Sequence, residues 1–248
     1  MVTINYLIKI EYDGTNFVGW QIQKNGKSVQ EIIENALGKF FGSKINITGA
    51  GRTDKGVHAT CQCANFYVKN RIKNKKNFLS AINFFLGDNL ISIIDIKQKK
   101  KDFNSRFSAK ERVYMYKIIN RFGSLSINKN KAWHIKKKLD LELLKKGAKV
   151  LMGTHDFSTF RASSCSAKSP VKKMNLVKVE KKGENISIIF KSKSFLQNQV
   201  RSMVGCLEHL SSRKWTLDKF KEVLKSRQRS KCARPAPAHG LYLINIKY

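Results

Sequence analysis

The chain has 248 residues, of which 42% are hydrophobic and 27% are charged. This composition is typical of a soluble globular protein with one large domain or two small ones. No apolar run approaches the roughly 18 residues that a membrane-spanning helix requires, and the first residues lack the pattern of a secretory signal peptide. We therefore expect a cytoplasmic protein.

Basic residues outnumber acidic residues by 49 to 17, which gives a net charge of +32. A polyanionic partner is the natural inference, because neutralising phosphates releases counterions and drives binding. Lysine outnumbers arginine by 38 to 11, so AT-biased codon usage can account for part of the excess. No basic amphipathic helix favours an anionic membrane instead. Nucleic acid is the expected partner, and charge alone does not separate RNA from DNA.

The first hundred residues alternate between strand and helix patterns. Ser28 and Glu31 form a capping box, which is typical of the first turn of a helix, and the apolar spacing after it is helical. The predicted elements are a strand over 4–12, a helix from 28 to 40, strands over 44–48 and 60–68, a helix over 78–86 and a strand over 90–96. The order βαββαβ is that of a ferredoxin-like unit.

A basic connection over residues 97–110 leads to a second half with a similar order of elements. Ser194 and Gln197 form another capping box and predict the start of a helix there. The predicted elements are strands over 112–120, 174–180, 186–191 and 241–247, and helices over about 139–152, from 194 to 207 and over 217–225.

These patterns predict an α+β fold made of two ferredoxin-like halves, residues 1–100 and 106–248. We expect pseudo-two-fold symmetry between the halves and antiparallel sheets flanked by helices. Packing of the halves would create a central basic cleft, and ligand sites favour such places. The duplication is inferred from the order of the elements only, since the two halves share no repeat at the level of residues.

The most informative stretch is residues 49–59, which read GAGRTDKGVHA. Its three glycines permit a sharp turn and close backbone approach, so the loop can present Asp54 at its tip. Arg52 and Lys55 flank this carboxylate and favour its ionised form, which suits a nucleophile or an anionic stabiliser. An isolated Asp-x-Gly more often simply closes a hairpin, and this alternative stays open from the loop alone.

Two further groups are candidates for chemistry. Arg201 shares a helix row with Gly205, where another backbone can approach. It is either a bidentate partner for a buried carboxylate or a solvated surface arginine. Tyr114 and Tyr116 lie on one face of a strand, where they either pack in the core or offer a ring on which a base can stack.

The remaining polar motifs are interpreted as structural. The segment from Tyr12 to Gln21 has the composition of a strand end and turn. His58 and His155 lack an orienting group at a readable spacing, so we expect them to anchor loops or contact RNA. Five cysteines include a Cys-x-Cys pair without the second pair of ligands that a structural zinc site needs, so we expect reduced thiols and no metal.

Ordered motifs run through nearly the whole chain, and together they are highly specific. They are Tyr12-Asp-Gly-Thr, Gly19-Trp20-Gln21, Ser28-Val-Gln-Glu31, Gly51 to Ala59, Phe103-Asn-Ser-Arg-Phe-Ser-Ala109, Arg112-x-Tyr114-x-Tyr116, His155-Asp-Phe, Phe195-Leu-x-x-x-Val-Arg201-x-Met-Val-Gly205 and Gly240-Leu-Tyr-Leu243. This set resembles the TruA family of tRNA pseudouridine synthases.

The resemblance implies an isomerase that converts uridine to pseudouridine in the tRNA anticodon stem-loop, typically at positions 38–40, without cofactor or metal. Asp54 matches the catalytic aspartate, Arg201 matches its basic partner, and Tyr114 matches the tyrosine that stacks on the target base. Whether the aspartate attacks the base or the ribose stays open. Family members are homodimers that place one tRNA across both subunits.

The resemblance also implies a set of substrate-binding residues. Leu241 matches the apolar residue that lines the pocket, and Arg52 matches an arginine that helps to extrude the base. Thr53 and Lys55 flank Asp54 and are expected to contact the substrate with it.

The sequence departs from the family pattern at two places. Lys55 replaces an alanine that is common in bacterial members, and Asn198-Gln199 stands where histidine or methionine is frequent. Neither change removes a catalytic group, but both bear on which uridines are modified. The alternative hypothesis is a catalytically silent RNA-binding protein on the same fold. A metal-dependent nuclease is disfavoured, because the sequence offers no carboxylate cluster for Mg²⁺.

Overall fold

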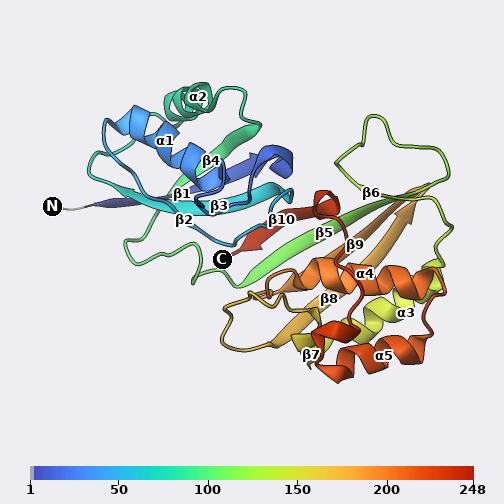
Figure 1. The fold of residues 1–248 in the computed structure, drawn as a ribbon. Coiled ribbons are helices and arrows are strands. Elements are labelled where there is room, and N and C mark those ends of the chain that lie inside the picture. The colour runs from blue at the N-terminus through green and yellow to red at the C-terminus, as the bar shows by residue number, and fades with distance from the viewer. Residues whose placement is uncertain (1–2) are drawn as a thin grey trace. The chain divides into compact units, whose positions relative to one another are not determined.

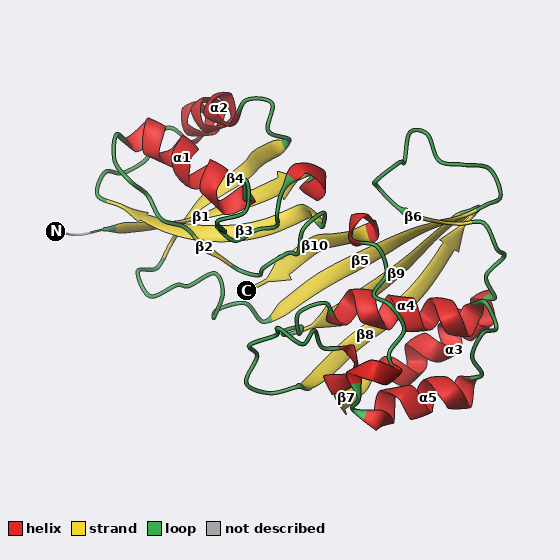
Figure 2. Cartoon of the chain, in the orientation of Figure 1, coloured by secondary structure: helices red, strands yellow, loops and turns green. Residues whose placement is uncertain are grey.

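The computed structural model describes residues 3–248, which fold into an α+β arrangement of five α-helices and ten strands (Figure 1, Figure 2). The predicted α+β class is therefore confirmed. The chain divides into two compact units: unit 1 runs to Lys110 and includes Leu243–Tyr248, whereas unit 2 is Glu111–Tyr242. None of the helices within residues 3–248 is both long and apolar enough to cross a membrane.

Unit 1 has the predicted order of elements. They are β1 (Ile4–Tyr12), α1 (Val29–Phe41), β2 (Thr48–Gly49), β3 (His58–Val68), α2 (Lys75–Leu86) and β4 (Ile91–Lys99). The last strand, β10 (Leu241–Lys247), joins this unit from Leu243 on. The strand order is β4-β1-β3-β10, with β2 on β3. β1 pairs antiparallel with both β3 and β4.

The core of unit 1 lies between its sheet and the two helices, which cover the same face of the strands (Figure 1). β1 alternates from Ile8 on, so that Ile8 and Ile10 are fully buried while Lys9 is exposed. Ile33 on α1 and Ile82 on α2 are also fully buried. The alternating strand and the amphipathic helices each have one apolar face. These faces are buried against one another, and this burial stabilises the two layers.

Unit 2 contains β5 (Glu111–Asn120), β6 (Trp133–Ile135), α3 (Leu141–Leu151), β7 (Gly153–Asp156), β8 (Val171–Lys182), β9 (Asn185–Ser192), α4 (Gln199–Ser211) and α5 (Leu217–Ser226). The strand order is β5-β9-β8-β7, and all of these pairs are antiparallel. β6 pairs with β5 in parallel, so the strand pairing is mixed, whereas the sequence predicted antiparallel sheets only.

The three helices of unit 2 cover one face of its sheet (Figure 2). Gly147 of α3 lets α4 approach closely, because a Cβ atom at this position would lie 2.6 Å from a methyl carbon of Leu207. Leu207 and Leu210 of α4 and Phe220 of α5 are fully buried at this junction. The core of unit 2 therefore depends on one small residue between large ones.

Two local predictions were wrong, and two short strands were missed. β2 has only two residues, since the backbone N–H of Ile47 donates to the Glu34 side chain (3.0 Å) instead of to a neighbouring strand. The short strands β6 and β7 were not predicted at all. α4 begins at Gln199 and not at Ser194, because Asn198 has φ = 61°, a left-handed conformation that a helix interior excludes.

The predicted cap of the first helix is confirmed, and it allows a stability test. The Ser28 side chain accepts a hydrogen bond from the Glu31 backbone N–H (3.2 Å). We expect Ser28→Ala to lower the free energy of unfolding by about 1 kcal/mol, measured by denaturant titration followed by circular dichroism. Ser80→Ala, on the exposed face of α2, is the matched control and should change it by less than about 0.5 kcal/mol. Equal effects of the two changes would contradict the capping role.

Candidate active site

The Asp54 loop connects β2 to β3 and closes on itself by a backbone hydrogen bond. The Val57 N–H donates to the Asp54 carbonyl oxygen (3.1 Å), and Gly56 has φ = 77°, which a side chain would disfavour. Asp54 is half-buried, whereas Arg52 and Lys55 on either side are exposed. The loop therefore presents one partly shielded carboxylate between two solvated cations.

The segment that follows β1 anchors the backbone of the loop at Thr53 and Asp54. The Trp20 N–H donates to the Thr53 carbonyl oxygen (3.0 Å), and Gly19 forms an isolated β-bridge with Asp54. Gly19 has φ = 125°, and a Cβ atom there would lie 2.7 Å from the Thr53 carbonyl oxygen. The Thr53 hydroxyl lies 2.7 Å from the hydroxyl of Tyr12, and both side chains are buried. The backbone beside Asp54 is thus fixed by contacts to residues more than thirty positions earlier.

His58 fixes the other end of the loop. It is 2% exposed, and its Nδ1 accepts a hydrogen bond from the Gly14 N–H (3.0 Å). The same Nδ1 lies 2.9 Å from a carboxylate oxygen of Asp13, so a protonated ring would donate to Asp13 instead. A Cβ atom on Gly14 would lie 2.0 Å from the Val57 carbonyl oxygen. Of the two roles predicted for His58, its burial favours the loop anchor.

In unit 2, Arg201 of α4 is half-buried and binds the backbone of a distant segment. Its Nε donates to the Ala236 carbonyl oxygen (2.8 Å) and one Nη donates to the Asn198 side chain (3.2 Å). The Ala236 N–H in turn donates to the Arg201 carbonyl oxygen (2.9 Å). A Cβ atom on Gly205 would lie 2.1 Å from the Arg234 carbonyl oxygen, so the predicted approach of another backbone is confirmed. Arg201 is therefore not the fully solvated arginine that its spacing also allowed.

The two tyrosines of β5 lie on one face, as predicted, and both are buried. The Tyr116 hydroxyl donates to the Pro237 carbonyl oxygen (2.7 Å). Burial raises the pKa of Tyr116, so this hydroxyl stays protonated and remains a donor at neutral pH. The Tyr114 ring meets Phe195 edge-on, with 5.1 Å between the ring centroids. Tyr114 and Leu241 are 7% and 6% exposed, so both are packed apolar surfaces in this structure.

His239 lies close enough to Arg201 for the guanidinium charge to affect its imidazole. Burial lowers the pKa of His239, and the Arg201 charge lowers it further. The imidazole is therefore neutral at neutral pH.

The predicted site residues thus fall into two groups, each described within its own unit. Unit 1 holds the loop residues Arg52, Thr53, Asp54 and Lys55, and unit 2 holds Tyr114, Arg201 and Leu241. Sequence reasoning missed the bond between Tyr12 and Thr53 and the contact of Arg201 with Ala236, because a long-range hydrogen bond leaves no local pattern. The only available signal was that Tyr12 begins a conspicuous motif.

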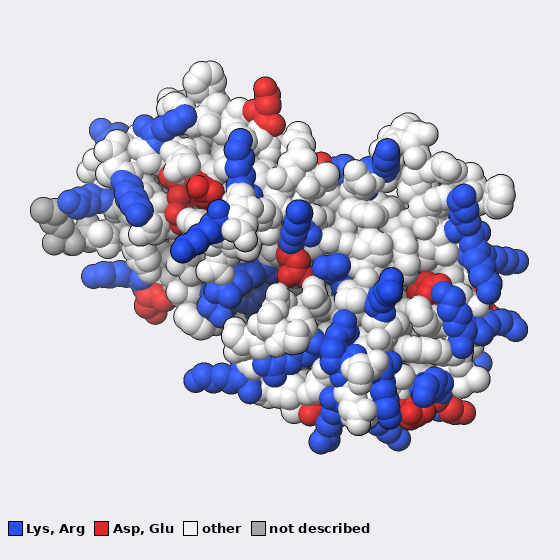
Figure 3. Space-filling model, in the orientation of Figure 1, with Lys and Arg blue, Asp and Glu red and all other residues white. Residues whose placement is uncertain are grey.

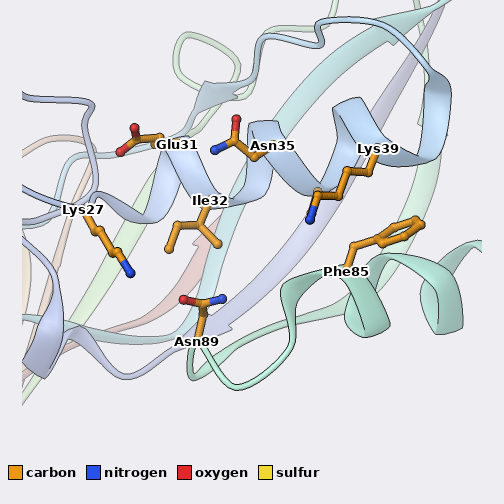
Figure 4. Close-up of a pocket in the computed structure, with 8 residues that line it drawn as sticks. Lys27, Glu31, Ile32, Asn35, Lys39, Phe85 and Asn89 are labelled. Carbon is orange, nitrogen blue, oxygen red and sulfur yellow. The ribbon is translucent and has the colours of Figure 1, made fainter.

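Neither a metal site nor a pocket adds to the predicted site residues within residues 3–248. Within residues 3–248, no three His, Cys, Asp or Glu side chains are grouped so that they could hold a metal ion. A shallow pocket lies between α1 and α2, and Figure 4 shows Lys27, Glu31, Lys39 and Phe85 around it. None of the predicted site residues lines this pocket.

Lys and Arg side chains are scattered over the visible face of each unit and outnumber the acidic side chains there (Figure 3). Ion pairs such as Lys219 with Glu222 are largely exposed and contribute little to stability. The excess of positive charge is thus available to an anionic partner.

Comparison with known proteins decides the family. The family model described as tRNA pseudouridine synthase matches residues 8–108 and 148–248. The chain belongs to the TruA family of tRNA pseudouridine synthases. The resemblance read from the motifs and the enzyme class, an isomerase, are therefore confirmed.

Relatives in this family align with almost the whole chain. A protein named tRNA pseudouridine synthase A from Pelagibacter ubique is 54% identical over 243 residues, which cover 98% of this chain and 99% of the relative. Proteins of the same name from Methylocella silvestris and Brucella ovis are 45% and 41% identical, with 98% of this chain covered in both cases and 98% and 97% of the relatives.

The close approach of the Arg234 backbone to Gly205 can be tested by substitution. In Gly205→Ala the new methyl group would overlap the Arg234 carbonyl oxygen, so we expect the free energy of unfolding to fall by about 1–3 kcal/mol. Gly38→Ala on α1 is the matched control, since its nearest heavy atom would be the Ser43 carbonyl oxygen at 3.5 Å. That variant should be as stable as the parent or up to about 1 kcal/mol more stable. Thermal and denaturant unfolding would measure both, and an unchanged Gly205→Ala protein would contradict the close approach.

Proposed function

We propose that the chain isomerises uridine to pseudouridine in the anticodon stem-loop of tRNA, typically at positions 38–40, with Asp54 as the catalytic nucleophile. The name shared by its relatives supports the tRNA substrate. The observation that carries the assignment of Asp54 is its place: a half-buried carboxylate on a loop whose backbone is bonded at Thr53 and closed at Val57. Such fixed geometry is what a nucleophile needs, because misplacement costs rate steeply.

The isomerisation needs only one ionised carboxylate. The N1–C1′ bond of uridine breaks and a C5–C1′ bond forms, while C5 loses one proton and N1 gains one. No separate general acid is required if the departing uracil anion stays in the pocket and bonds again through C5, in contrast to glycosidases, which use two carboxyl groups. The carboxylate either adds to the base or traps the ribose carbon, and both routes leave the atom balance unchanged.

The other catalytic roles follow from the motif matches. We assign Tyr114 to stacking on the target base and Arg201 to pairing with the catalytic carboxylate. The uridine must leave its stack first, at a cost of about a few kcal/mol, and an aromatic ring and a cation compensate part of that cost. The bonds of Arg201 to Ala236 and Asn198 support this role, since they fix the guanidinium plane.

The proposed substrate contacts lie on the loop and at the start of β10. Arg52 and Lys55 are exposed and suit phosphate contacts and base extrusion. Thr53 lies between Arg52 and Asp54, and Leu241 provides an apolar wall for the pyrimidine. These assignments rest on the position of each residue in its motif.

The proposal extends to the architecture of the two halves and to the assembly of the protein. We propose that residues 1–100 and 106–248 are ferredoxin-like halves related by pseudo-two-fold symmetry, with a basic cleft that receives the RNA. We further propose a cytoplasmic homodimer. The similar element order of the halves and the net charge of +32 support the first point, and the family resemblance supports the second.

Replacing the carboxylate tests the chemistry directly. Asp54→Asn keeps the shape of the side chain but removes its charge, so we expect turnover to fall by about 10⁴-fold or more while tRNA affinity stays within about two-fold. Tritium release from tRNA labelled at uridine C5 measures turnover, and filter binding measures affinity. Normal tritium release by this variant would refute the proposal. Unmodified uridines with the wild-type protein would instead favour a silent RNA binder.

A second variant tests the arginine. Arg201→Lys keeps the positive charge but cannot donate to both Ala236 and Asn198 with a planar group, so we expect kcat to fall by about 10²-fold. Arg213→Lys is the matched control, because Arg213 is an exposed arginine just beyond α4 that pairs with Asp140. It should leave kcat unchanged. Full activity of Arg201→Lys would show that the charge alone is sufficient.

A further inference from the structure

The hydroxyl of Tyr12 is the side-chain group on β1 that reaches the catalytic loop. It lies 2.7 Å from the Thr53 hydroxyl, and the two residues are 3% and 7% exposed. The Tyr12 ring packs against Trp20, with 6.1 Å between the ring centroids. The backbone N–H of Trp20 donates to the carbonyl oxygen of Thr53. Thr53 is therefore held at two atoms, one on its side chain and one on its backbone.

This double attachment bears on Asp54 because the two residues are adjacent. The Thr53 carbonyl belongs to the peptide group that joins Thr53 to Asp54, so any rotation there moves the carboxylate. The bond between the two hydroxyls selects one rotamer of a β-branched side chain. The closure from the Val57 N–H to the Asp54 carbonyl oxygen fixes the peptide on the far side. The loop tip then has little freedom except at the Asp54 side chain itself.

We propose that Tyr12 is a positioning residue for the catalytic carboxylate and acts through the Thr53 hydroxyl. The inference rests on the proposed role of Asp54. The Tyr12 hydroxyl need not touch the substrate. It keeps the peptide before Asp54 in the one orientation from which the carboxylate can attack, since catalytic groups have to be held within a fraction of an ångström by their supporting shell.

The test removes one oxygen atom and preserves the packing. Tyr12→Phe keeps the ring against Trp20 but leaves the buried Thr53 hydroxyl without this partner, so the side chain turns or admits water. We expect kcat to fall by about 10- to 100-fold. KM and tRNA affinity should stay within about two-fold, because neither a charge nor a phosphate contact is lost.

A matched control lies on the same strand. Tyr6 is 5% exposed, and its hydroxyl accepts a hydrogen bond from the Ile72 N–H (3.0 Å), away from the Asp54 loop. Tyr6→Phe should lower the melting temperature about as much as Tyr12→Phe but leave kcat unchanged. On the Thr53 side, Thr53→Val keeps the shape of the side chain but removes its hydroxyl, so its kcat should fall as far as that of Tyr12→Phe.

The outcomes separate this inference from the proposed function. An inactive Asp54→Asn protein together with a Tyr12→Phe protein of normal kcat would overturn the positioning role alone. A fully active Asp54→Asn protein would overturn the role of Asp54 and this inference with it. A loss of kcat in Tyr6→Phe equal to that in Tyr12→Phe would assign the effect to general loosening of β1 and would also overturn the positioning role.

Discussion

The close approach of the backbone at Gly19 to that of Thr53 is the constraint on which the Asp54 loop depends. Only glycine fits at position 19, because its φ is positive and a Cβ atom would overlap the Thr53 carbonyl oxygen. This approach brings the Trp20 N–H within bonding distance of the same oxygen. The backbone next to Asp54 is thereby anchored to the segment that follows β1.

The residues that supply the positive charge differ from those that hold Thr53 and Arg201 in place. The net charge of +32 resides largely on exposed side chains, where it raises affinity for a polyanion and makes binding sensitive to salt. The contacts described at Thr53 and Arg201 are instead made with uncharged groups: the Tyr12 hydroxyl and the Trp20 N–H at Thr53, and the Ala236 carbonyl and the Asn198 side-chain amide at Arg201. Exposed side chains thus supply most of the positive charge, whereas buried and half-buried groups hold Thr53 and Arg201 in place.

How much could be predicted from the sequence depended on the range of each interaction. Helix α1 and its cap at Ser28 follow from spacing within four residues, and both were predicted correctly. The second capping box failed because Asn198 adopts a left-handed conformation, which asparagine tolerates better than most residues, and the helix could begin only after it. Gly205 marked the approach of a backbone, but the identity of that backbone, residues 234–236, required the fold. The contact between Tyr12 and Thr53 spans 41 positions, so nothing near either residue revealed it.

The contacts around Thr53 in unit 1 and around Arg201 in unit 2 share one arrangement, in which a glycine and a polar side chain meet the same backbone segment. In unit 1 a glycine admits the backbone at Thr53, and a tyrosine hydroxyl then orients the side chain there. In unit 2 Gly205 admits the backbone at Arg234, and Arg201 then bonds to Ala236 two residues on. In each case the glycine determines how near the chains can come, and the polar side chain determines their orientation. A substitution at the glycine therefore disturbs packing and geometry together, whereas the loss of a single polar atom disturbs geometry alone.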